Sequence, residues 1–382
     1  MPDHWLEKIT HELSALEEQS LLRRLPEPQH IQDTADFHSN DYLGLSRHTA
    51  VIEAACEHIA RHGFGSGGSR LIGGNSSAHR ELEEALADFK NRPAALGFTS
   101  GYATAMGVVP PLMDEPDDLI LTDRLAHACL VDAARAARAT LRVFAHNDTE
   151  QLETLLKKSA NKRRRILIIA EALYSMDGDF CPIDELVALK DRYGARLLLD
   201  EAHSTGIQGP QGRGLAAERG LSERIDIAMG TLGKALGSCG GFVAVEKKLR
   251  DYLINRSRQF IFTTAPPGAC CAAALAAVKI CLGQEGEKLR RDLADNTARL
   301  RAALGAPPTQ SPIIPHPVGG ERLAVRLAQT LALGGWHLPA IRHPTVKKGA
   351  ARLRLTAKSF HTPAQIEEIA RAIRQAMQIC VE

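Results

Sequence analysis

One lysine of this chain, Lys234, lies in a glycine-flanked octapeptide, residues 230–237, that directly follows the apolar run 225–229. A short apolar run followed by glycine is typical of a buried strand that ends in a tight turn. A lysine held in such a turn is poorly hydrated, so we expect the pKa of its amine to fall. That would suit an amine that forms Schiff bases. An ordinary lysine in a strand-to-helix loop fits the octapeptide equally well.

An aspartate and a histidine follow a second apolar run. Residues 196–200 predict a short buried strand that ends in Asp200, and His203 comes three residues later. A buried aspartate is unfavourable unless a cation or a donor meets it, and a pyridinium nitrogen is such a partner. His203 could then reach the ring hydroxyl. A helix N-cap is the alternative for Asp200 alone, but Asp-x-x-His followed by the glycine-flanked Lys234 indicates pyridoxal 5′-phosphate (PLP).

The chain resembles a known family over almost its whole length. Besides the two segments above, the resemblance rests on residues 39–45, 65–70, 99–102, 123–128, 171–179, 340–346 and 351–356. These segments resemble the α-oxoamine synthases, PLP enzymes of the aspartate-aminotransferase fold. The resemblance implies an α/β fold of PLP-dependent transferase fold type I, with a large, mostly parallel-sheet domain and a smaller C-terminal α/β domain. It also implies a homodimer whose sites lie at the subunit interface.

The resemblance also implies a reaction. Residues 341–346, with Arg352 and Arg354 shortly after them, favour the family member of biotin biosynthesis, which condenses L-alanine with a pimeloyl thioester of coenzyme A or acyl carrier protein and releases CO2. Lys234 would remove the Cα proton, Asp200 would keep the pyridinium charged, and His127 would polarise the new ketone. Other members, such as 2-amino-3-ketobutyrate CoA ligase, remain alternatives, as do an aminotransferase and a non-enzymatic scaffold.

Several further residues are expected to hold the cofactor. Residues 99–104 follow an apolar run and open a helical pattern, so the first backbone amides of that helix could bind the phosphate; Ser100 would be its N-cap. By resemblance, His127 stacks on the ring and contacts substrate, and Glu171 supports the site. The expected cofactor residues are Gly101, Tyr102, His127, Ser175, Asp200, His203, Thr231, Lys234 and, reaching the neighbouring subunit, Thr264.

Substrate contacts are expected near both ends of the chain. A guanidinium binds a carboxylate in a bidentate manner, and Arg352 and Arg354 alternate along a predicted strand, so both face one side. The resemblance assigns the substrate carboxylate to Arg354, whereas a solvated strand arginine fits Arg352 better. It also assigns a contact to Thr345. The family's N-terminal substrate arginine aligns with Leu22, and Arg23 could replace it.

Apolar periodicity predicts the elements that position these residues. Strands are expected at 94–98, 118–122, 141–145, 166–170, 196–200, 225–229 and 241–245, and helices at 4–24, 49–62, 76–90, 268–304 and 363–378. Strands that alternate with helices predict a layered, mostly parallel sheet. Residues 63–68 fit the dinucleotide fingerprint, but they follow a helix rather than a strand, which argues against a nicotinamide site.

Composition and charge argue against several classes of protein and suggest how the chain divides into domains. A chain of 382 residues, 44% of them hydrophobic, can bury a large core, and we expect an N-terminal helix and arm (1–48), a large PLP-binding domain (49–285) and a small C-terminal domain (286–382). A net charge of +2 indicates neither nucleic acid nor a membrane as partner. The basic residues 162–165 predict a solvated loop, with anion binding as the alternative. Eight cysteines without Cys-x-x-Cys spacing argue against zinc and disulfides, and no signal-peptide core is evident, so we expect a cytoplasmic protein.

Overall fold

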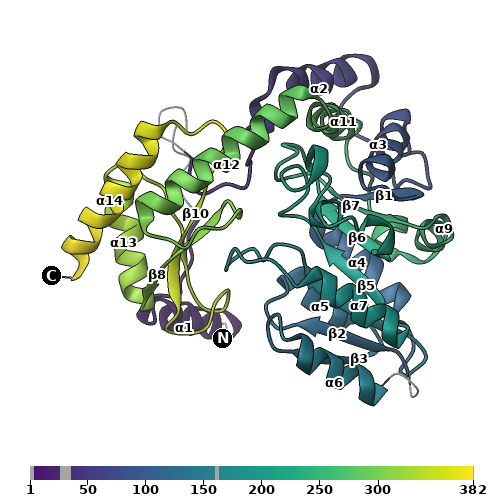
Figure 1. The fold of residues 1–382 in the computed structure, drawn as a ribbon, viewed down its shortest axis with the longest axis horizontal. Coiled ribbons are helices and arrows are strands. Elements are labelled where there is room, and N and C mark those ends of the chain that lie inside the picture. Colours follow the sequence, from purple (N-terminus) through teal and green to yellow (C-terminus); the bar gives the residue numbers. More distant parts are fainter. Residues whose placement is uncertain (1–3, 26–35, 160–162, 382) are drawn as a thin grey trace. The chain divides into compact units, whose positions relative to one another are not determined.

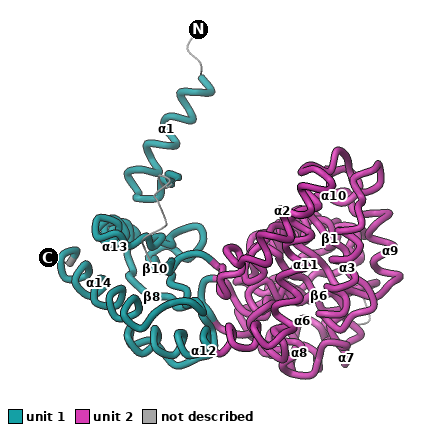
Figure 2. Tube along the Cα trace, turned by 90° about the horizontal axis from the view of Figure 1, so that it is seen from above, with its two compact units in different colours: residues 1–39, 176–178, 292–382 teal, residues 40–175, 179–291 magenta. Residues whose placement is uncertain are grey.

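The structure, a computed structural model, describes residues 4–25, 36–159 and 163–381 (Figure 1). The chain divides into two compact units. Unit 1 comprises residues 1–39, 176–178 and 292–382, and unit 2 comprises residues 40–175 and 179–291 (Figure 2). The N-terminal arm therefore groups with the C-terminal residues, whereas the expected boundaries at 48 and 285 treated it as a separate part.

A seven-stranded sheet forms the centre of unit 2, in the order β1-β7-β6-β5-β4-β2-β3. The seven predicted strands are confirmed, each within two residues of its expected place. They are β1 (Ala94–Phe98), β2 (Leu119–Asp123), β3 (Thr140–Phe144), β4 (Ile166–Glu171), β5 (Arg196–Asp200), β6 (Ile227–Thr231) and β7 (Gly241–Val245). Only β7 runs antiparallel to its neighbours, β1 and β6, so the expected mostly parallel sheet is also confirmed.

The central strands are nearly continuous apolar runs because both faces of the sheet are covered. On one face, Ile120, Leu198 and Val243 pack in a core with residues of α4 (Gly101–Leu112) and α5 (Ala128–Ala136). Alternate residues point to the other face, where Leu199 is equally buried. The remaining helices of unit 2 are α2 (Thr49–His62), α3 (Ser77–Phe89), α6 (Thr149–Ser159), α7 (Ile183–Tyr193), α8 (Leu215–Glu218), α9 (Lys247–Arg256), α10 (Arg258–Ile261) and α11 (Gly268–Leu282).

The predicted helix 268–304 is in fact two helices, α11 and α12 (Gln284–Leu304). Gly283 between them is extended, with φ −89° and ψ 178°, and it ends α11. The two helices turn so closely there that a Cβ on Gly286 would lie 2.4 Å from the Ile280 carbonyl oxygen. Within the described residues, no single helix is long and apolar enough to cross a membrane, although the bent pair α11 and α12 meets the length and composition criteria together.

Unit 1 contains a three-stranded antiparallel sheet with the order β8-β10-β9. Its elements are β8 (Ile313–Gly319), β9 (Ala340–Ile341), β10 (Ala351–Thr356), α1 (His4–Glu18), α13 (Glu321–Leu333), α14 (Pro363–Val381) and most of α12. The predicted strand near Arg352 and the closing helix are thereby confirmed, together with an α/β character for this unit.

The first helix is shorter than predicted. It ends at Glu18 rather than at residue 24, because Ser20 adopts a left-handed conformation (φ 57°) and the amides of Leu21 and Leu22 both donate to the Leu16 carbonyl. A left-handed residue with such back-donated bonds is a common way to end a helix. Pro26 and Pro28, which follow the predicted helix 4–24, lie outside the described residues.

Two arginines of the basic segment 162–165 pair with acids, and Arg163 donates to the Thr140 hydroxyl at 3.2 Å. Arg165 Nη2 lies 2.6 Å from Asp118 Oδ2 and 2.7 Å from Asp114 Oδ1, and Arg164 lies 3.4 Å from Glu115. Lys162 lies outside the described residues. Because these guanidinium groups already have carboxylate partners, the alternative of an anion site gains no support. The eight cysteines are all free, and five of them are buried.

Candidate active site

The carboxyl ends of six of the seven strands lie at one edge of the unit 2 sheet. β2, β3, β4, β5 and β6 are parallel, and β1 runs in the same direction because both β1 and β6 are antiparallel to β7. In open α/β sheets this edge is where sites form. The segments that follow these strands carry the predicted residues Gly101, Tyr102, His127, Ser175, His203 and Lys234, with Asp200 and Thr231 as the last residues of β5 and β6.

Lys234 and His203 are in direct contact. The Nζ atom of Lys234 lies 2.8 Å from His203 Nε2, and His203 Nδ1 lies 2.7 Å from the hydroxyl of Tyr42. Both ring nitrogens of His203 therefore have a polar partner. The structure places Lys234 against the segment that follows Asp200, and their shared role stays a prediction. Tyr42 was not predicted as a site residue, because it is 161 positions from His203 and no local pattern connects them.

Two buried carboxyl groups lie side by side at this edge, Asp200 on β5 and Glu171 opposite it on β4. Burial raises the pKa of Asp200, against the attraction of Lys234. Burial, and then the neighbouring Asp200, raise the pKa of Glu171 to about 8, although Glu171 accepts backbone amides of His127 and Ser175. A cation placed against Asp200 would offset the unfavourable burial of its negative charge.

The alternative role of Asp200 as a helix N-cap is wrong. No helix begins after Asp200, since residues 202–207 form turns.

His127 is the N-cap of α5. Its Nδ1 accepts the amide of Cys129 at 3.2 Å and lies 3.0 Å from the Cys129 sulfur. Burial, and then the nearby Lys234 cation, lower the pKa of His127. The ring is therefore neutral at pH 7 with its proton on Nε2, and it is suited to stack on a flat cofactor and to donate one hydrogen bond. Cys129 was not predicted, and as a buried small residue it gave no distinguishing signal.

The amino end of α4 offers backbone amides at this edge that could bind a phosphate. Ser100 caps the helix by accepting the Ala103 amide at 3.0 Å, as expected, which leaves the first amides of the helix, on Gly101 and Tyr102, as donors. A Cβ on Gly101 would lie 3.8 Å from the Thr231 Cβ, so Thr231 borders the same place. Its hydroxyl donates to the Gly240 carbonyl at 3.0 Å, and a bond to phosphate would replace this one.

The predicted substrate residues belong to unit 1. Arg354 is buried on β10, with 5% of its surface exposed. Thr345 is exposed, and Arg23 donates to the carbonyl of His343 at 3.0 Å, so the structure brings Arg23 beside the Thr345 segment. The interpretation of Arg352 as a solvated arginine is wrong. Residues 176–178 of the same unit cover it, and it pairs with Asp177 at 2.7 Å.

Thr264 is exposed and forms an isolated bridge with Ser69. Its expected contact with the phosphate of a neighbouring subunit stays a prediction, as do the individual roles of the other site residues.

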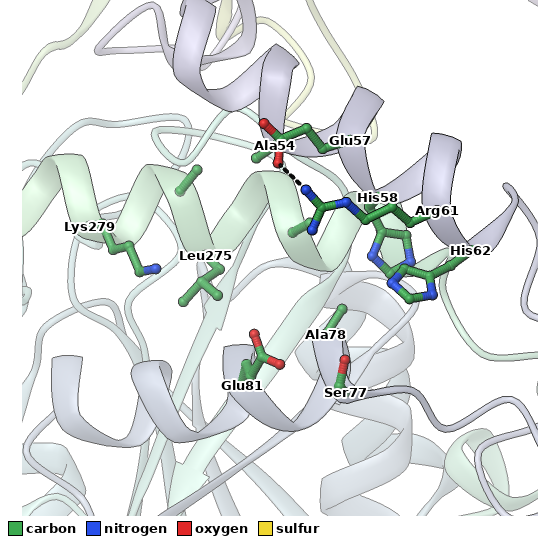
Figure 3. Close-up of a pocket in the computed structure, with 12 residues that line it drawn as sticks. Ala54, Glu57, His58, Arg61, His62, Ser77, Ala78, Glu81, Leu275 and Lys279 are labelled. Atoms are coloured by element: carbon green, nitrogen blue, oxygen red, sulfur yellow. Dashed lines mark ion pairs between the residues drawn. The ribbon is translucent and has the colours of Figure 1, made fainter.

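A hollow elsewhere on unit 2 is separate from these residues. It has a volume of about 360 Å³ and lies between α2, α3 and α11 (Figure 3). Arg61 pairs with Glu57 at its rim, and the rings of His58 and His62 pack 4.8 Å apart. None of the predicted site residues lines it. The predicted site residues therefore lie at the strand ends and not in this hollow.

Comparisons with known proteins agree with this geometry. Residues 32–373 match the model of the family "aminotransferase class I and II". The chain is 41% identical to the 8-amino-7-oxononanoate synthase of Geobacter sulfurreducens over 96% of both chains, and 42% identical to that of Geotalea daltonii over 88% of this chain and 86% of the relative.

Solved structures give the same picture. A serine palmitoyltransferase from S. paucimobilis, solved with a PLP–myriocin adduct, superposes with a TM-score of 0.89 at 28% identity over 98% of both chains. The 8-amino-7-oxononanoate synthase of Francisella tularensis superposes with a TM-score of 0.77 at 26% identity, covering 92% of this chain and all of that one. With its family model matched over most of its length and its fold shared with these enzymes, the chain belongs to the class I and II aminotransferase family.

Proposed function

We propose that this chain is a PLP-dependent acyltransferase that condenses L-alanine with a pimeloyl thioester to 8-amino-7-oxononanoate, CO2 and free thiol, a step of biotin biosynthesis. The observation that carries the proposal is the contact of the Lys234 amine with His203 beside the buried Asp200. The names of relatives at 41–43% identity support the choice of reaction. We also propose that the protein works in the cytoplasm as a homodimer.

The residues at the sheet edge fit the cofactor. Lys234 would hold its aldehyde, the buried Asp200 would face the ring nitrogen, and His203 would face the ring oxygen. The amides of Gly101 and Tyr102 would receive the phosphate at the helix terminus. When bound, PLP supplies an electron sink for the carbanion formed at the amino acid Cα. Its positive ring nitrogen would supply the cation that offsets the unfavourable burial of the Asp200 carboxylate.

The chain's own groups would carry the remaining work. Lys234 would take the Cα proton, and Arg354 would orient the alanine carboxylate in bidentate contact. His127 is neutral and carries its proton on Nε2, so it would donate to the oxygen of the new ketone. We propose Thr345 and Arg23 as further substrate contacts, and Ser175, Thr231 and Thr264 as further cofactor contacts.

The test combines purified protein with PLP, L-alanine and pimeloyl-CoA and identifies the product by mass spectrometry. We expect 8-amino-7-oxononanoate, with less product from glycine or serine. In parallel, borohydride reduction and peptide mapping should locate the cofactor on Lys234. Lys234→Ala should lose both the label and turnover, while Lys279→Ala, at an exposed position of α11, should keep both. A label elsewhere, or turnover without Lys234, would refute the assignment.

A second reaction of the same class has a structural observation in its favour. The serine palmitoyltransferase structure superposes better on this chain than the 8-amino-7-oxononanoate synthase structure does, with TM-scores of 0.89 and 0.77. The same assay with L-serine and palmitoyl-CoA separates the two reactions. A higher kcat/KM for this pair than for alanine and pimeloyl-CoA would reverse our choice.

A further inference from the structure

Three loops at the carboxyl ends of the unit 2 strands are in contact through one histidine, His146, which follows β3. Its Nδ1 atom lies 3.0 Å from Asp123 Oδ1, and its Nε2 atom lies 2.7 Å from Asp179 Oδ2. Asp123 is the last residue of β2, ahead of His127, and Asp179 follows Ser175 in the loop after β4. All of these residues belong to unit 2.

The geometry requires a charged ring. Each nitrogen of His146 faces a carboxylate oxygen, and a carboxylate only accepts, so both nitrogens must carry protons. Burial opposes this charge, but the hydrogen bonds to Asp123 and Asp179 outweigh it and raise the pKa of His146 to about 10. The Asn147 amide nitrogen also donates to Asp179 Oδ2, at 3.2 Å, which explains its approach to His146 Nε2. The Tyr174 ring packs edge-on against the imidazole, with centroids 4.4 Å apart.

The two aspartates in turn bind the segments that carry site residues, Asp123 through its carboxylate and Asp179 through its backbone carbonyl. Asp123 Oδ1 accepts the amide of Leu125 at 2.7 Å, two residues before His127. The Asp179 carbonyl accepts the amide of Tyr174 at 2.9 Å, the residue before Ser175. At their other ends, both segments donate an amide to Glu171. Each segment is therefore held at two points.

We propose that His146 is a positioning residue whose imidazolium joins Asp123 to Asp179 and thereby sets the places of His127 and Ser175. Without the cation, the two carboxylates would face one another with only hydrogen bonds from neutral groups, such as that of the Asn147 amide nitrogen to Asp179, to offset their repulsion, and the loops would separate. The roles of His127 and Ser175 rest on the proposed function. The joining of the loops does not, and it can be measured in the cofactor-free protein.

Hydrogen exchange of the cofactor-free protein, followed by mass spectrometry, tests the joining. In His146→Phe we expect faster exchange in peptides covering 123–129 and 172–181, with β7 (241–245) unchanged. His62→Phe, at an exposed position of α2, is the matched control and should leave both peptides protected. Exchange at the wild-type rate in His146→Phe would overturn the proposal, even if the variant unfolds at a lower temperature.

A charge-relief variant keeps the test decisive if His146→Phe does not fold. Asp179→Asn combined with His146→Gln removes the cation and one of the two anions together. We expect this double variant to be better protected in both peptides than His146→Gln alone, because one carboxylate no longer repels the other. Equal protection in the two variants would mean that charge compensation is not what holds the loops.

Kinetics separate positioning from a merely structural role. In the PLP-loaded enzyme we expect His146→Phe to lower kcat about 10²-fold, the effect of misplacing a reacting group by about 1 Å, with the KM for the thioester little changed. The visible circular dichroism of bound PLP should change as well. Wild-type kcat and dichroism in the variant would contradict the proposal. If the wild type itself neither binds PLP nor turns over, the proposed function fails while the exchange experiment still decides on His146.

Discussion

Two buried charged clusters in unit 2 are joined at consecutive residues, Asp200 and Glu201. The site cluster consists of Glu171, Asp200, Lys234 and His127, which influence one another's ionisation. The anchor cluster consists of Lys90, Glu201, Thr205 and the carbonyl of Arg213. There the Lys90 ammonium lies 2.9 Å from Glu201, 2.8 Å from the Thr205 hydroxyl and 2.7 Å from the carbonyl. Both charged side chains are 1% exposed.

The difference lies in how completely each charge is compensated. In the anchor cluster all three ammonium protons have an acceptor, and Glu201 also accepts the amide of Ala216 at 3.0 Å. In the site cluster two carboxyl groups share one nearby lysine, and burial raises the pKa of both. A buried charge that the protein leaves under-compensated is a common mark of a site that awaits a ligand. We therefore expect the anchor cluster to matter mainly for stability and the site cluster to matter mainly for binding.

The largest effect is expected for Asp200→Asn. Turnover should fall by about 10²- to 10⁴-fold, the range typical for loss of one acid–base group. The cofactor-free protein should be at least as stable as the wild type, because a poorly compensated buried charge is removed. Steady-state kinetics and urea denaturation measure the two effects, with Asp88→Asn, a 75% exposed position, as control. A destabilised variant that retains turnover would erase the distinction between the clusters.

In the anchor cluster, Lys90→Met should lower stability much more than turnover, the opposite of Asp200→Asn. It leaves Glu201 buried and unpaired, which lowers the free energy of unfolding by about 3–5 kcal/mol. Turnover of the folded fraction should fall far less than in Asp200→Asn. Lys157→Met on the exposed face of α6 should stay within about 0.5 kcal/mol of the wild type. Adding Glu201→Gln to Lys90→Met should recover part of the loss, and no recovery would argue against the pair.

The pH dependence of stability sharpens the contrast further. Glu171 ionises in the unfolded chain near the ordinary glutamate pKa of 4.5, but in the folded protein its pKa is raised to about 8. Between these values the folded state binds more protons, so stability should fall as pH rises from about 5 through 8. Glu171→Gln lacks this group, so its free energy of unfolding should decline less over that interval. Urea titrations of both cofactor-free proteins at several pH values measure the difference, and parallel curves would contradict it.

The smallest effect is expected for Tyr42→Phe, which removes the hydroxyl that faces His203. The loss of one hydrogen bond of about 0.5–1.5 kcal/mol corresponds to a drop of about 2- to 10-fold in kcat/KM. Tyr252→Phe removes a hydroxyl that contacts the Pro111 carbonyl on α4 and should leave kcat/KM unchanged. An equal loss in both variants would show that Tyr42 has no particular link to the site.

Most strands were predictable because a buried strand is a short apolar run between polar turns, and all seven runs of unit 2 became strands. The predicted helix boundaries were wrong where the backbone conformation of a single residue ends a helix. Ser20 ends α1 early through a left-handed turn, and Gly283 divides a helix that the alanine-rich pattern made continuous. The reversed direction of β7 also left no mark in its apolar run, because parallel and antiparallel buried strands have the same composition.

Local residue types and spacing were enough to single out Lys234, Asp200 and His203 as a candidate site, since a cofactor of this kind needs an amine, an acid and a donor at the ends of neighbouring strands. The contact of Tyr42 with His203, the burial of Lys90 against Glu201 and the joining of three loops at His146 emerged only on folding. Lys90 and Glu201 are 111 positions apart. Whether a carboxylate is compensated depends on distances of a few ångströms and on exclusion of water, and packing between remote segments sets both.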